Sequence, residues 1–549
     1  MIGQGKIFVN HCGFTPGEAK YFVVIDPPTE EFQIIRRWDR RVVYSGQLNK
    51  VSGDLGTGWV GSFSEVREEG TYLIQCGKLQ SRVVTIYRQI YEYPLRTIFN
   101  YFPTQRCGDS TTGWHSPCHT ADGRRIDTGK HIDVTGGWHQ SCDLRKWTFG
   151  TSYGLIGLAQ LGLGRPRWDT GQVSEEIKWG NQYFHKMVRP DGGLMDHVVL
   201  PLGWVEERDV YSNNAPSVAT YNTIIGQAMI ARFFKVTDPI YSNKCLKIAQ
   251  KMWQYITGPD YPKSPYEPPV IPKYHEWMPG FFSQNYPGSA LDLGDSLYAA
   301  ISMYYATGEE KWLDEACWRA SSLVNLQVEG DVLLDPTAAC FYVGPGRPDF
   351  LCTAYDGIFG PIGLCELLQL KPDHKDAERW LRAVRLLADQ KCIMSERNPW
   401  GLIPSYWYTT DPGGGRKIGS GYYRYFYGYK GLRLGLNLDI IGSALFLLKA
   451  YRITGDQRYH DVACRQFDWI LGCNPFDAST VEGVGRNQPE RLINTDEFFP
   501  PTPQIPGAVM TGIAGTSTDE PAEFRGGCES EYDMPPTAML MWLMLELME

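Results

Sequence analysis

Three short turns of similar composition constrain the fold of this chain more than any other feature. They read VTDPIY at 236–241, ATGEEKW at 306–312 and ITGDQRY at 453–459, and each follows a segment whose apolar residues have helical spacing. In these turns we expect a Gly or Asp in a left-handed cap to end one helix, and an aromatic residue to stand near the start of the next helix. Repeated units of this kind predict a stack of helical hairpins.

The number of residues available favours a closed arrangement of these hairpins. Helical spacing is clearest in the segments 221–236, 295–306 and 441–453. About 450 residues follow the point where this pattern begins, so we expect a closed toroid of about a dozen helices. A solenoid is the alternative. The long irregular stretches 257–290 and 400–430 instead favour loops on one face of a barrel, where chemistry tends to lie.

The first 88 residues have a different character. Short runs of β-branched and aromatic residues lie at 6–10, 21–26, 32–38, 41–48, 70–76 and 81–87. Turn residues such as SGDLGTG at 52–58 separate them, which predicts a small β-sandwich. A chain of 549 residues exceeds one hydrophobic core, so we place two domains at 1–90 and 91–549.

Composition excludes several classes of function. The net charge is −9 with no basic run, so we expect no nucleic acid partner. Apolar runs are too short to span a membrane, and we expect no membrane partner. The N-terminus lacks a basic start followed by an apolar stretch, so we expect no signal peptide and a chain that is cytoplasmic or lacks its leader. The 14 Cys are scattered, which favours reduced, buried thiols over a disulfide scaffold.

Two cysteines and two histidines form a candidate metal cluster. Cys107, Cys118, His119 and His139 have the spacing Cys-x10-Cys-His-x19-His, and such a set suits a closed tetrahedral zinc site. The segment 103–135 that carries most of them is poor in apolar residues, so a metal would help to hold it. Unrelated buried thiols and surface histidines are the alternative. The zinc would be structural, because four protein ligands leave no open position.

Carboxylates occur where a catalytic acid and base could form. Asp143 ends the turn GGWHQSCD at 136–143, and a metal on His139 would fix that turn. Glu529, Glu531 and Asp533 precede an apolar helix near the C-terminus, where helix capping is the alternative role. A carboxyl in apolar surroundings makes a usable acid, while a hydrogen-bonded Asp stays ionised as a base. Two such groups roughly 6.5–9.5 Å apart hydrolyse a glycosidic bond with inversion.

Several segments, in this order, carry a resemblance to a known family: KIFVNHCGFTP at 6–16, YFPTQRCG at 101–108, CHTAD at 118–122, DVTGGWHQSCDLRKW at 133–147, the segment 453–486, PGAV at 506–509 and a terminal Glu before an apolar helix. Over nearly its whole length the chain resembles glycoside hydrolase family 9, in particular members with an N-terminal immunoglobulin-like domain. The resemblance implies an immunoglobulin-like β-sandwich followed by an all-α (α/α)6 barrel, and an inverting hydrolase of β-linked glycans.

The resemblance also implies roles for individual residues. Asp143 matches the general base of the family, and Glu529 matches the general acid. Gln140 stands where the family has a second aspartate that holds the attacking water. The same resemblance implies structural zinc on Cys107, Cys118, His119 and His139. Many members also bind calcium, but no segment here allows calcium ligands to be assigned.

Three departures from the family pattern bear on the substrate. Gln140 can hydrogen-bond a water but supplies no negative charge. The stretch GRNQPERLINTDEF at 485–498 lacks the His-His-Arg motif of family cellulases, and Pro535-Pro536 replaces an Asn near the final helix. We therefore expect a β-linked glycan or oligosaccharide other than crystalline cellulose, with exo action as one mode. A weakened or inactive glycan-binding relative is the alternative, and a lyase that uses Tyr532 is a third class.

Candidate sugar contacts come from aromatic and basic residues. Trp138, Tyr422 and Tyr423 are candidates to stack on sugar rings, with core packing as the alternative role. Arg486 and Arg491 are candidates to replace the missing cleft contacts and would suit a charged sugar, with a solvated surface position as the alternative.

Overall fold

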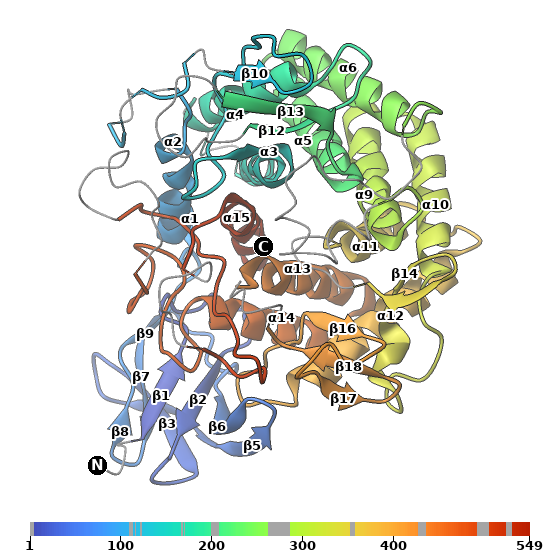
Figure 1. Cartoon of the computed structure of the whole chain (residues 1–549). Coiled ribbons are helices and arrows are strands. Elements are labelled where there is room, and N and C mark those ends of the chain that lie inside the picture. The colour runs from blue at the N-terminus through green and yellow to red at the C-terminus, as the bar shows by residue number, and fades with distance from the viewer. Residues whose placement is uncertain are drawn as a thin grey trace.

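Strands between residues 6 and 86 form a β-sandwich, and the chain from Glu92 onward forms a ring of helices (Figure 1). Both parts were predicted from the sequence. The computed structural model describes residues 5–108, 113–115, 117–120, 123–165, 168, 171–198, 208–261, 286–351, 357–426, 435–490, 504–522 and 530–548, with the backbone alone for 208–214.

The sandwich consists of two antiparallel sheets that enclose a core rich in phenylalanine. One sheet has the order β1 (Lys6–Val9), β2 (Tyr21–Ile25), β6 (Gly56–Ser62), β5 (Asn49–Gly53). The other has the order β4 (Val42–Gln47), β3 (Glu31–Arg36), β7 (Gly70–Cys76), β8 (Leu79–Gln80), and β9 (Val84–Ile86) also pairs with β7. Phe22 lies edge-on to Phe32, with ring centroids 4.9 Å apart, and contacts Phe63 in this core.

One part of the sandwich differs from the prediction. The segment 52–58 was expected to be a separating turn, but it is the tip of a hairpin formed by β5 and β6. Its glycines obscure the strand pattern. A strand is recognised by apolar residues at every second position, and glycine adds no apolar side chain to that alternation.

Six inner helices form a closed ring, in which each packs against its two neighbours: α3 (Thr148–Gly164), α5 (Ser217–Phe234), α9 (Ala290–Thr307), α11 (Phe359–Leu370), α13 (Asn437–Thr454) and α15 (Met534–Leu547). Helices of an outer layer alternate with them along the chain: α1 (Glu92–Phe99), α4 (Gln172–Met187), α6 (Pro239–Ile256), α10 (Glu310–Val324), α12 (Ala377–Ser395) and α14 (Gln457–Ile470). This is the (α/α)6 architecture, in which α3 and α15 close the ring (Figure 1).

Residue patterns explain which helices lie inside. Inner helix α15 buries 13 of its 14 residues, as expected of a helix that is apolar on every side. Outer helix α6 buries only a stripe, which includes Cys245, Ala249 and Met252. Where α3 meets α15, a Cβ on Gly157 would lie 2.6 Å from the carbonyl oxygen of Ala538, so only glycine permits this close packing.

The turns that link inner to outer helices mostly follow the prediction. Gly308 and Gly455 end α9 and α13 with φ of 75° and 72°, which confirms the left-handed caps. The prediction is wrong for Asp238, whose φ is −147°. That residue instead caps the start of α6, where its side chain accepts a hydrogen bond from the backbone N–H of Tyr241.

Short elements lie between the helices. They are α2 (Tyr101–Thr104), a 3₁₀ turn (Pro336–Ala339), the sheet β10 (Gly123–Arg125), β13 (Arg208–Asn214), β12 (Met195–Val198), β11 (Lys146–Trp147), the pair β14 (Tyr342–Gly344) and β15 (Arg347–Phe350), and the sheet β16 (Tyr406–Tyr408), β18 (Gly421–Arg424), β17 (Arg416–Ile418). The stretch 400–430, expected to be a loop, thus contains a small sheet. Most of the expected loop 257–290 lies outside the described residues.

The β5–β6 hairpin joins the sandwich to the ring. At its tip, the backbone N–H of Asp54 donates to the carbonyl of Arg397, 2.9 Å away. The carboxylate of Asp54 accepts hydrogen bonds from the hydroxyls of Tyr423 and Tyr425 at 2.6 and 3.1 Å and from Nε of Arg397 at 3.0 Å. Three donors on one carboxylate fix the orientation of the sandwich.

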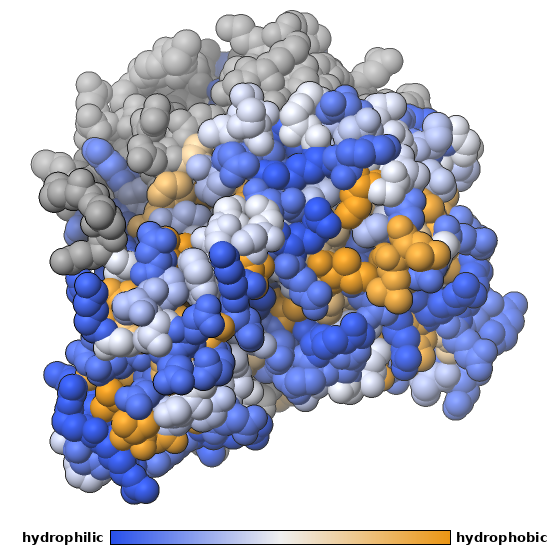
Figure 2. All heavy atoms as spheres, turned by 90° about the horizontal axis from the view of Figure 1, so that it is seen from below, coloured by the Kyte–Doolittle hydropathy of each residue, from blue (hydrophilic) through white to orange (hydrophobic). Residues whose placement is uncertain are grey.

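The surface is predominantly polar. Figure 2 shows one face of the molecule, on which hydrophilic residues predominate and hydrophobic residues form separate patches. Among the described residues, no helix has the length and apolar character needed to cross a membrane.

The contacts of Asp54 predict that Asp54→Asn weakens the attachment of the sandwich. The amide cannot accept from all three donors as a charged group does, so we expect the free energy of unfolding to fall by about 2 kcal/mol. Asp39→Asn is the matched control, since Asp39 pairs with Arg36 of the same domain and makes this ion pair away from the junction. Urea unfolding of both variants measures the effect, and an equal loss in the two would contradict this account.

Candidate active site

The turn that carries Asp143 is held in a tight conformation just before α3. Gly136 and Gly137 have φ of 79° and 73°, a region that favours glycine. The backbone N–H of Gln140 donates to the carbonyl of Arg145, which closes the turn. Leu144 is buried with φ of 57°, which is unusual for a residue with a branched side chain. Such strain persists only where the surrounding structure enforces it.

The segment that leads into the last inner helix pairs with this turn. Ser141 forms a β-bridge with Asp533, and Tyr532 forms one with Met510. Asp533 is also the N-cap of α15 and accepts from the backbone N–H of Met534. The start of α3 and the start of α15 therefore lie side by side, and the hydroxyl of Ser141 contacts carboxylates from both segments, Asp143 and Glu531.

Asp143 is partly open to solvent and held by several donors. Its Oδ1 accepts from the hydroxyl of Ser141 at 3.1 Å and from the backbone N–H of Arg145 at 3.2 Å. Its Oδ2 lies 3.4 Å from Nε of Arg145, and 28% of the Asp143 side chain is exposed. Donors and a neighbouring cation favour the ionised form of a carboxyl, which suits a general base.

Glu531 is the carboxylate found beside Asp143. Its Oε1 accepts from the Ser141 hydroxyl at 2.6 Å and lies 3.6 Å from the sulfur of Cys142. Burial, followed by the charge of Asp143, raises the pKa of Glu531 to about 7. Glu529, which the resemblance matches to the general acid, lies outside the described residues.

Gln140 and Asp533 form the second polar pair of the site. Nε2 of Gln140 donates to Oδ1 of Asp533 at 3.2 Å. Oε1 of Gln140 is buried with no hydrogen-bond partner among the described residues. Burial, followed by the charge of Glu531, raises the pKa of Asp533 well above its usual range. A Cβ on Gly150 would lie 2.1 Å from Cδ of Gln140, so this glycine makes room for the amide.

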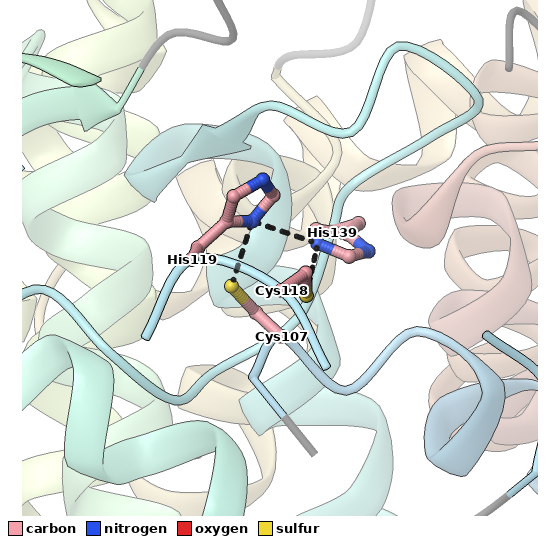
Figure 3. Close-up of side chains that lie close together, drawn as sticks. All are labelled: Cys107, Cys118, His119 and His139. Atoms are coloured by element: carbon pink, nitrogen blue, oxygen red, sulfur yellow. Dashed lines mark hydrogen bonds between the residues drawn. The ribbon is translucent and has the colours of Figure 1, made fainter. Parts of the chain in front are cut away.

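The four predicted metal ligands converge on one point, as Figure 3 shows. Nδ1 of His119 lies 3.2 Å from the sulfur of Cys107 and 3.4 Å from Nε2 of His139, which is 3.7 Å from the sulfur of Cys118. Burial lowers the pKa of His139 to about 3, so its ring is neutral and can act as a ligand. The sequence prediction that these residues lie together is confirmed, and the cluster can hold a metal ion.

The predicted sugar-stacking residues are placed less favourably. Trp138 is fully buried and its Nε1 donates to Glu176, so the prediction that it stacks on sugar is wrong. Tyr423 is 1% exposed and bonds to Asp54, which likewise excludes stacking. Tyr422 is half-buried, with Nζ of Lys417 4.6 Å from its ring centroid.

Of the two predicted arginines, the structure describes one, Arg486. Nη2 of Arg486 donates to Asp477 at 2.9 Å, and its backbone N–H donates to His11 of the sandwich. This side chain therefore lies at the junction between sandwich and ring. Arg491 lies outside the described residues.

A cavity that sequence reasoning missed opens at the same end of the ring. It has a volume of about 110 Å³ and lies at the N-terminal ends of α9, α11 and α13. Lys391, Asp439, Ser443 and Trp407 are among its lining residues, and Nζ of Lys391 donates to Ser443 at 3.0 Å. Burial lowers the pKa of Lys391 to about 8. These residues are far apart in sequence, so no local pattern could group them.

Comparisons with known proteins identify the family. The model of glycosyl hydrolase family 9 matches residues 91–340, and that of the cellulase N-terminal ig-like domain matches residues 3–81. The matched region, residues 91–340, belongs to glycoside hydrolase family 9. It is thus a glycoside hydrolase of an inverting family, which confirms the resemblance seen in the sequence.

Relatives match over most of the chain at low identity. Endoglucanase D of Acetivibrio thermocellus is 24% identical, covering 91% of this chain and 77% of its own length. A cellodextrinase of Butyrivibrio fibrisolvens is 23% identical, covering 95% and 93%. Among solved structures, a metagenome-derived family 9 endoglucanase has a TM-score of 0.72 at 20% identity and covers 99% of both chains. A Zn-binding triple mutant of the family 9 endoglucanase J30 has a TM-score of 0.67 at 18% identity, covering 98% of this chain and 100% of its own.

The Gln140–Asp533 pair predicts that Gln140→Asp destabilises the fold as pH rises. Two adjacent carboxyls cannot both ionise, so the folded state would hold a proton that the unfolded state releases above pH 4. We expect a loss of about 1–3 kcal/mol in unfolding free energy at pH 8 and a smaller loss at pH 5. Gln140→Asp/Asp533→Asn should recover most of it, because an amide again faces a carboxylate. Thermal unfolding at both pH values is the measurement, and a pH-independent loss would refute this reading.

Proposed function

We propose that this protein hydrolyses β-linked glycans or oligosaccharides with inversion, with Asp143 as general base, Gln140 holding the attacking water and Glu529 as general acid. The observation that carries the proposal is the setting of Asp143. Its carboxylate is partly exposed at the end of the ring beside the Arg145 guanidinium, three residues after Gln140, whose amide oxygen has no hydrogen-bond partner among the described residues.

Each residue has a defined part in this reaction. Oε1 of Gln140 accepts a hydrogen bond from the water and orients it, but it leaves deprotonation to Asp143. The guanidinium of Arg145 lies 3.4 Å from Oδ2 of Asp143 and orients this carboxylate beside the water. A carboxylic acid on the far side of the bond protonates the leaving oxygen, and Glu529 is the residue that we assign to that step.

We propose an oligosaccharide as the substrate rather than crystalline cellulose. A cellodextrinase and a xyloglucan-specific endo-beta-1,4-glucanase of Bacteroides ovatus are among the relatives, at 23% and 21% identity. The absent His-His-Arg motif at 485–498 removes contacts that grip a long chain. Exo action on oligosaccharide ends fits these features.

We further propose that the Cys/His cluster holds a structural zinc ion. Ligand atoms around tetrahedral zinc lie roughly 3.3–3.8 Å apart, given the usual zinc–sulfur and zinc–nitrogen bond lengths. The contacts of 3.2, 3.4 and 3.7 Å in the cluster fit that spacing. The backbone N–H of Gly108 donates to the sulfur of Cys118, a bond that favours thiolate. Zinc would hold His139, and with it the start of the turn that presents Asp143.

Hydrolysis is tested with a panel of β-glucan, xyloglucan and chito-oligosaccharides. The first-formed product should have the inverted anomeric configuration by proton NMR. Asp143→Asn should lower kcat by about 100- to 10,000-fold, the usual contribution of a general base, and Glu529→Gln should have a similar effect. Tyr422→Phe is the control and should retain turnover. Retention of configuration would exclude the mechanism, and full activity of Glu529→Gln would remove the assigned acid.

Zinc is tested by metal content and stability together. We expect about one zinc per chain by atomic absorption, and its removal should lower the unfolding free energy by about 4 kcal/mol, the stabilisation expected when metal exceeds its Kd 1,000-fold. Cys118→Ser should lose the metal, whereas Cys245→Ser, a buried thiol elsewhere, should keep it. Zinc retained by Cys118→Ser would rule out this ligand set.

A non-catalytic glycan-binding role is the second candidate, and Gln140 is the observation that favours it. A neutral amide gives the water less basicity than a carboxylate would. Calorimetric binding of an oligosaccharide with no product after long incubation would favour this role over hydrolysis.

A further inference from the structure

One hydroxyl connects the two carboxylates of the site. Oγ of Ser141 lies 3.1 Å from Oδ1 of Asp143 and 2.6 Å from Oε1 of Glu531. A hydroxyl carries one proton, so it can donate to one carboxylate and must accept from the other if both contacts are hydrogen bonds. The three groups therefore form a chain along which a proton can move.

The surroundings of the two carboxylates differ. Asp143 is partly exposed and has the backbone N–H and the guanidinium of Arg145 beside it. Glu531 is more enclosed and faces the charges of Asp143 and Asp533, with Arg145 as the nearby cation. Burial and the charge of Asp143 raise the pKa of Glu531 to about 7, so Glu531 holds a proton below that pH and is a carboxylate that can accept one above it.

The spacing places Glu531 on the same side of the reaction as Asp143. Both carboxylate oxygens contact one hydroxyl and so lie within about 6 Å of each other, less than the roughly 6.5–9.5 Å that separates base and acid in inverting glycosidases. Glu531 therefore does not stand across a glycosidic bond from Asp143 as the proton donor. It lies behind the base.

We propose that Ser141 and Glu531 form a proton relay behind Asp143. The inference rests on the proposed hydrolysis. As the water oxygen bonds to the anomeric carbon, its O–H bond breaks and the proton goes to Asp143. Asp143 gives this proton to Oγ of Ser141, which releases its own proton to Glu531, and Asp143 is again a carboxylate. Glu531 then loses the proton to solvent, and the general acid, which gave its proton to the leaving oxygen, takes one back from solvent, so no net proton is gained or lost in the cycle.

The relay gives a role to Ser141 and Glu531, which the sequence pattern left unexplained. Gln140 supplies no charge at the water and is bound to Asp533 instead. The second carboxylate of the base comes from position 531, from the other end of the ring, and it acts through Ser141. Ser141 and Glu531 are positioning residues in this scheme, since neither contacts the water.

Three variants test the relay through the pH dependence of kcat/KM. Ser141→Ala removes the hydroxyl, Ser141→Thr keeps it, and Glu531→Gln removes the terminal proton acceptor. We expect Ser141→Ala and Glu531→Gln each to lower kcat about tenfold. In the wild type kcat/KM should fall as the pH drops below about 7, and in both variants this fall should occur at lower pH. Ser141→Thr should restore both. Ser152→Ala is the control, because that buried hydroxyl bonds only to a backbone carbonyl.

A titration without substrate tests the coupling separately. In protein labelled with ¹³C at glutamate carboxyls, the Glu531 signal is the one that is absent from Glu531→Gln. It should titrate near pH 7 in the wild type, and its pKa should be about one unit lower in Asp143→Asn. No shift would overturn the relay. The relay would also be overturned if Ser141→Ala left kcat and the pH dependence of kcat/KM unchanged while Asp143→Asn was inactive. The proposed hydrolysis would then remain intact. Full activity of Asp143→Asn would instead defeat the proposed function.

Discussion

The hydrogen bonds that close the helical ring are the interaction on which the site depends. The backbone N–H of Met534 donates to the carbonyl of Gln140, and that of Asp533 donates to the carbonyl of Val509. The first bond ties the entrance of the last inner helix to the turn before the first one, and the second ties it to the segment that contains Val509. Ser141 and Glu531 are 390 positions apart in sequence, yet ring closure brings them into contact. Without it, Asp143 would have no carboxylate beside it.

Ring closure concentrates buried acidic groups, which has an energetic cost. An ionised carboxyl in an apolar setting is unfavourable unless it is paired or neutralised. Asp533 reduces the cost by accepting hydrogen bonds from Gln140 and Met534, and burial raises its pKa well above the usual range. Glu531 is poised between the two states, since its raised pKa lies close to neutrality. The environments of the three carboxyls therefore differ, from buried Asp533 to partly exposed Asp143.

Features encoded locally could be predicted from the sequence. Most strands of the sandwich, the inner helices α5, α9 and α13, and the glycine caps at 308 and 455 follow from residue periodicity and turn composition. The metal cluster followed from the chemistry of its side chains, although its spacing fits no common template. The position of Asp143 followed from its turn and from the family resemblance.

Features that depend on long-range packing could not be predicted. Glu531 has no local mark that separates it from Glu529 or Asp533, because only ring closure selects the carboxyl that meets Ser141. Tyr423 has the composition of a sugar contact, yet the tip of the β5–β6 hairpin occupies its hydroxyl. Trp138 is similar, because its burial depends on Glu176 and Gly180 of α4. Aromatic residues signal sugar binding only when the tertiary structure leaves a face open.

The position of Asp143 is determined from two directions at once. On the N-terminal side, the backbone N–H of His139 donates to the carbonyl of Gln105, and its ring belongs to the metal cluster. On the other side, Gln140 and Ser141 are bound to the segment that enters α15. The positive φ of Leu144 lies between these anchors and the start of α3. A backbone held at both ends can keep such a conformation, and a base must stay in place while water and sugar move. In the proposed mechanism, the cluster and the ring closure therefore act by fixing the position of one carboxylate, although neither contacts the reacting atoms.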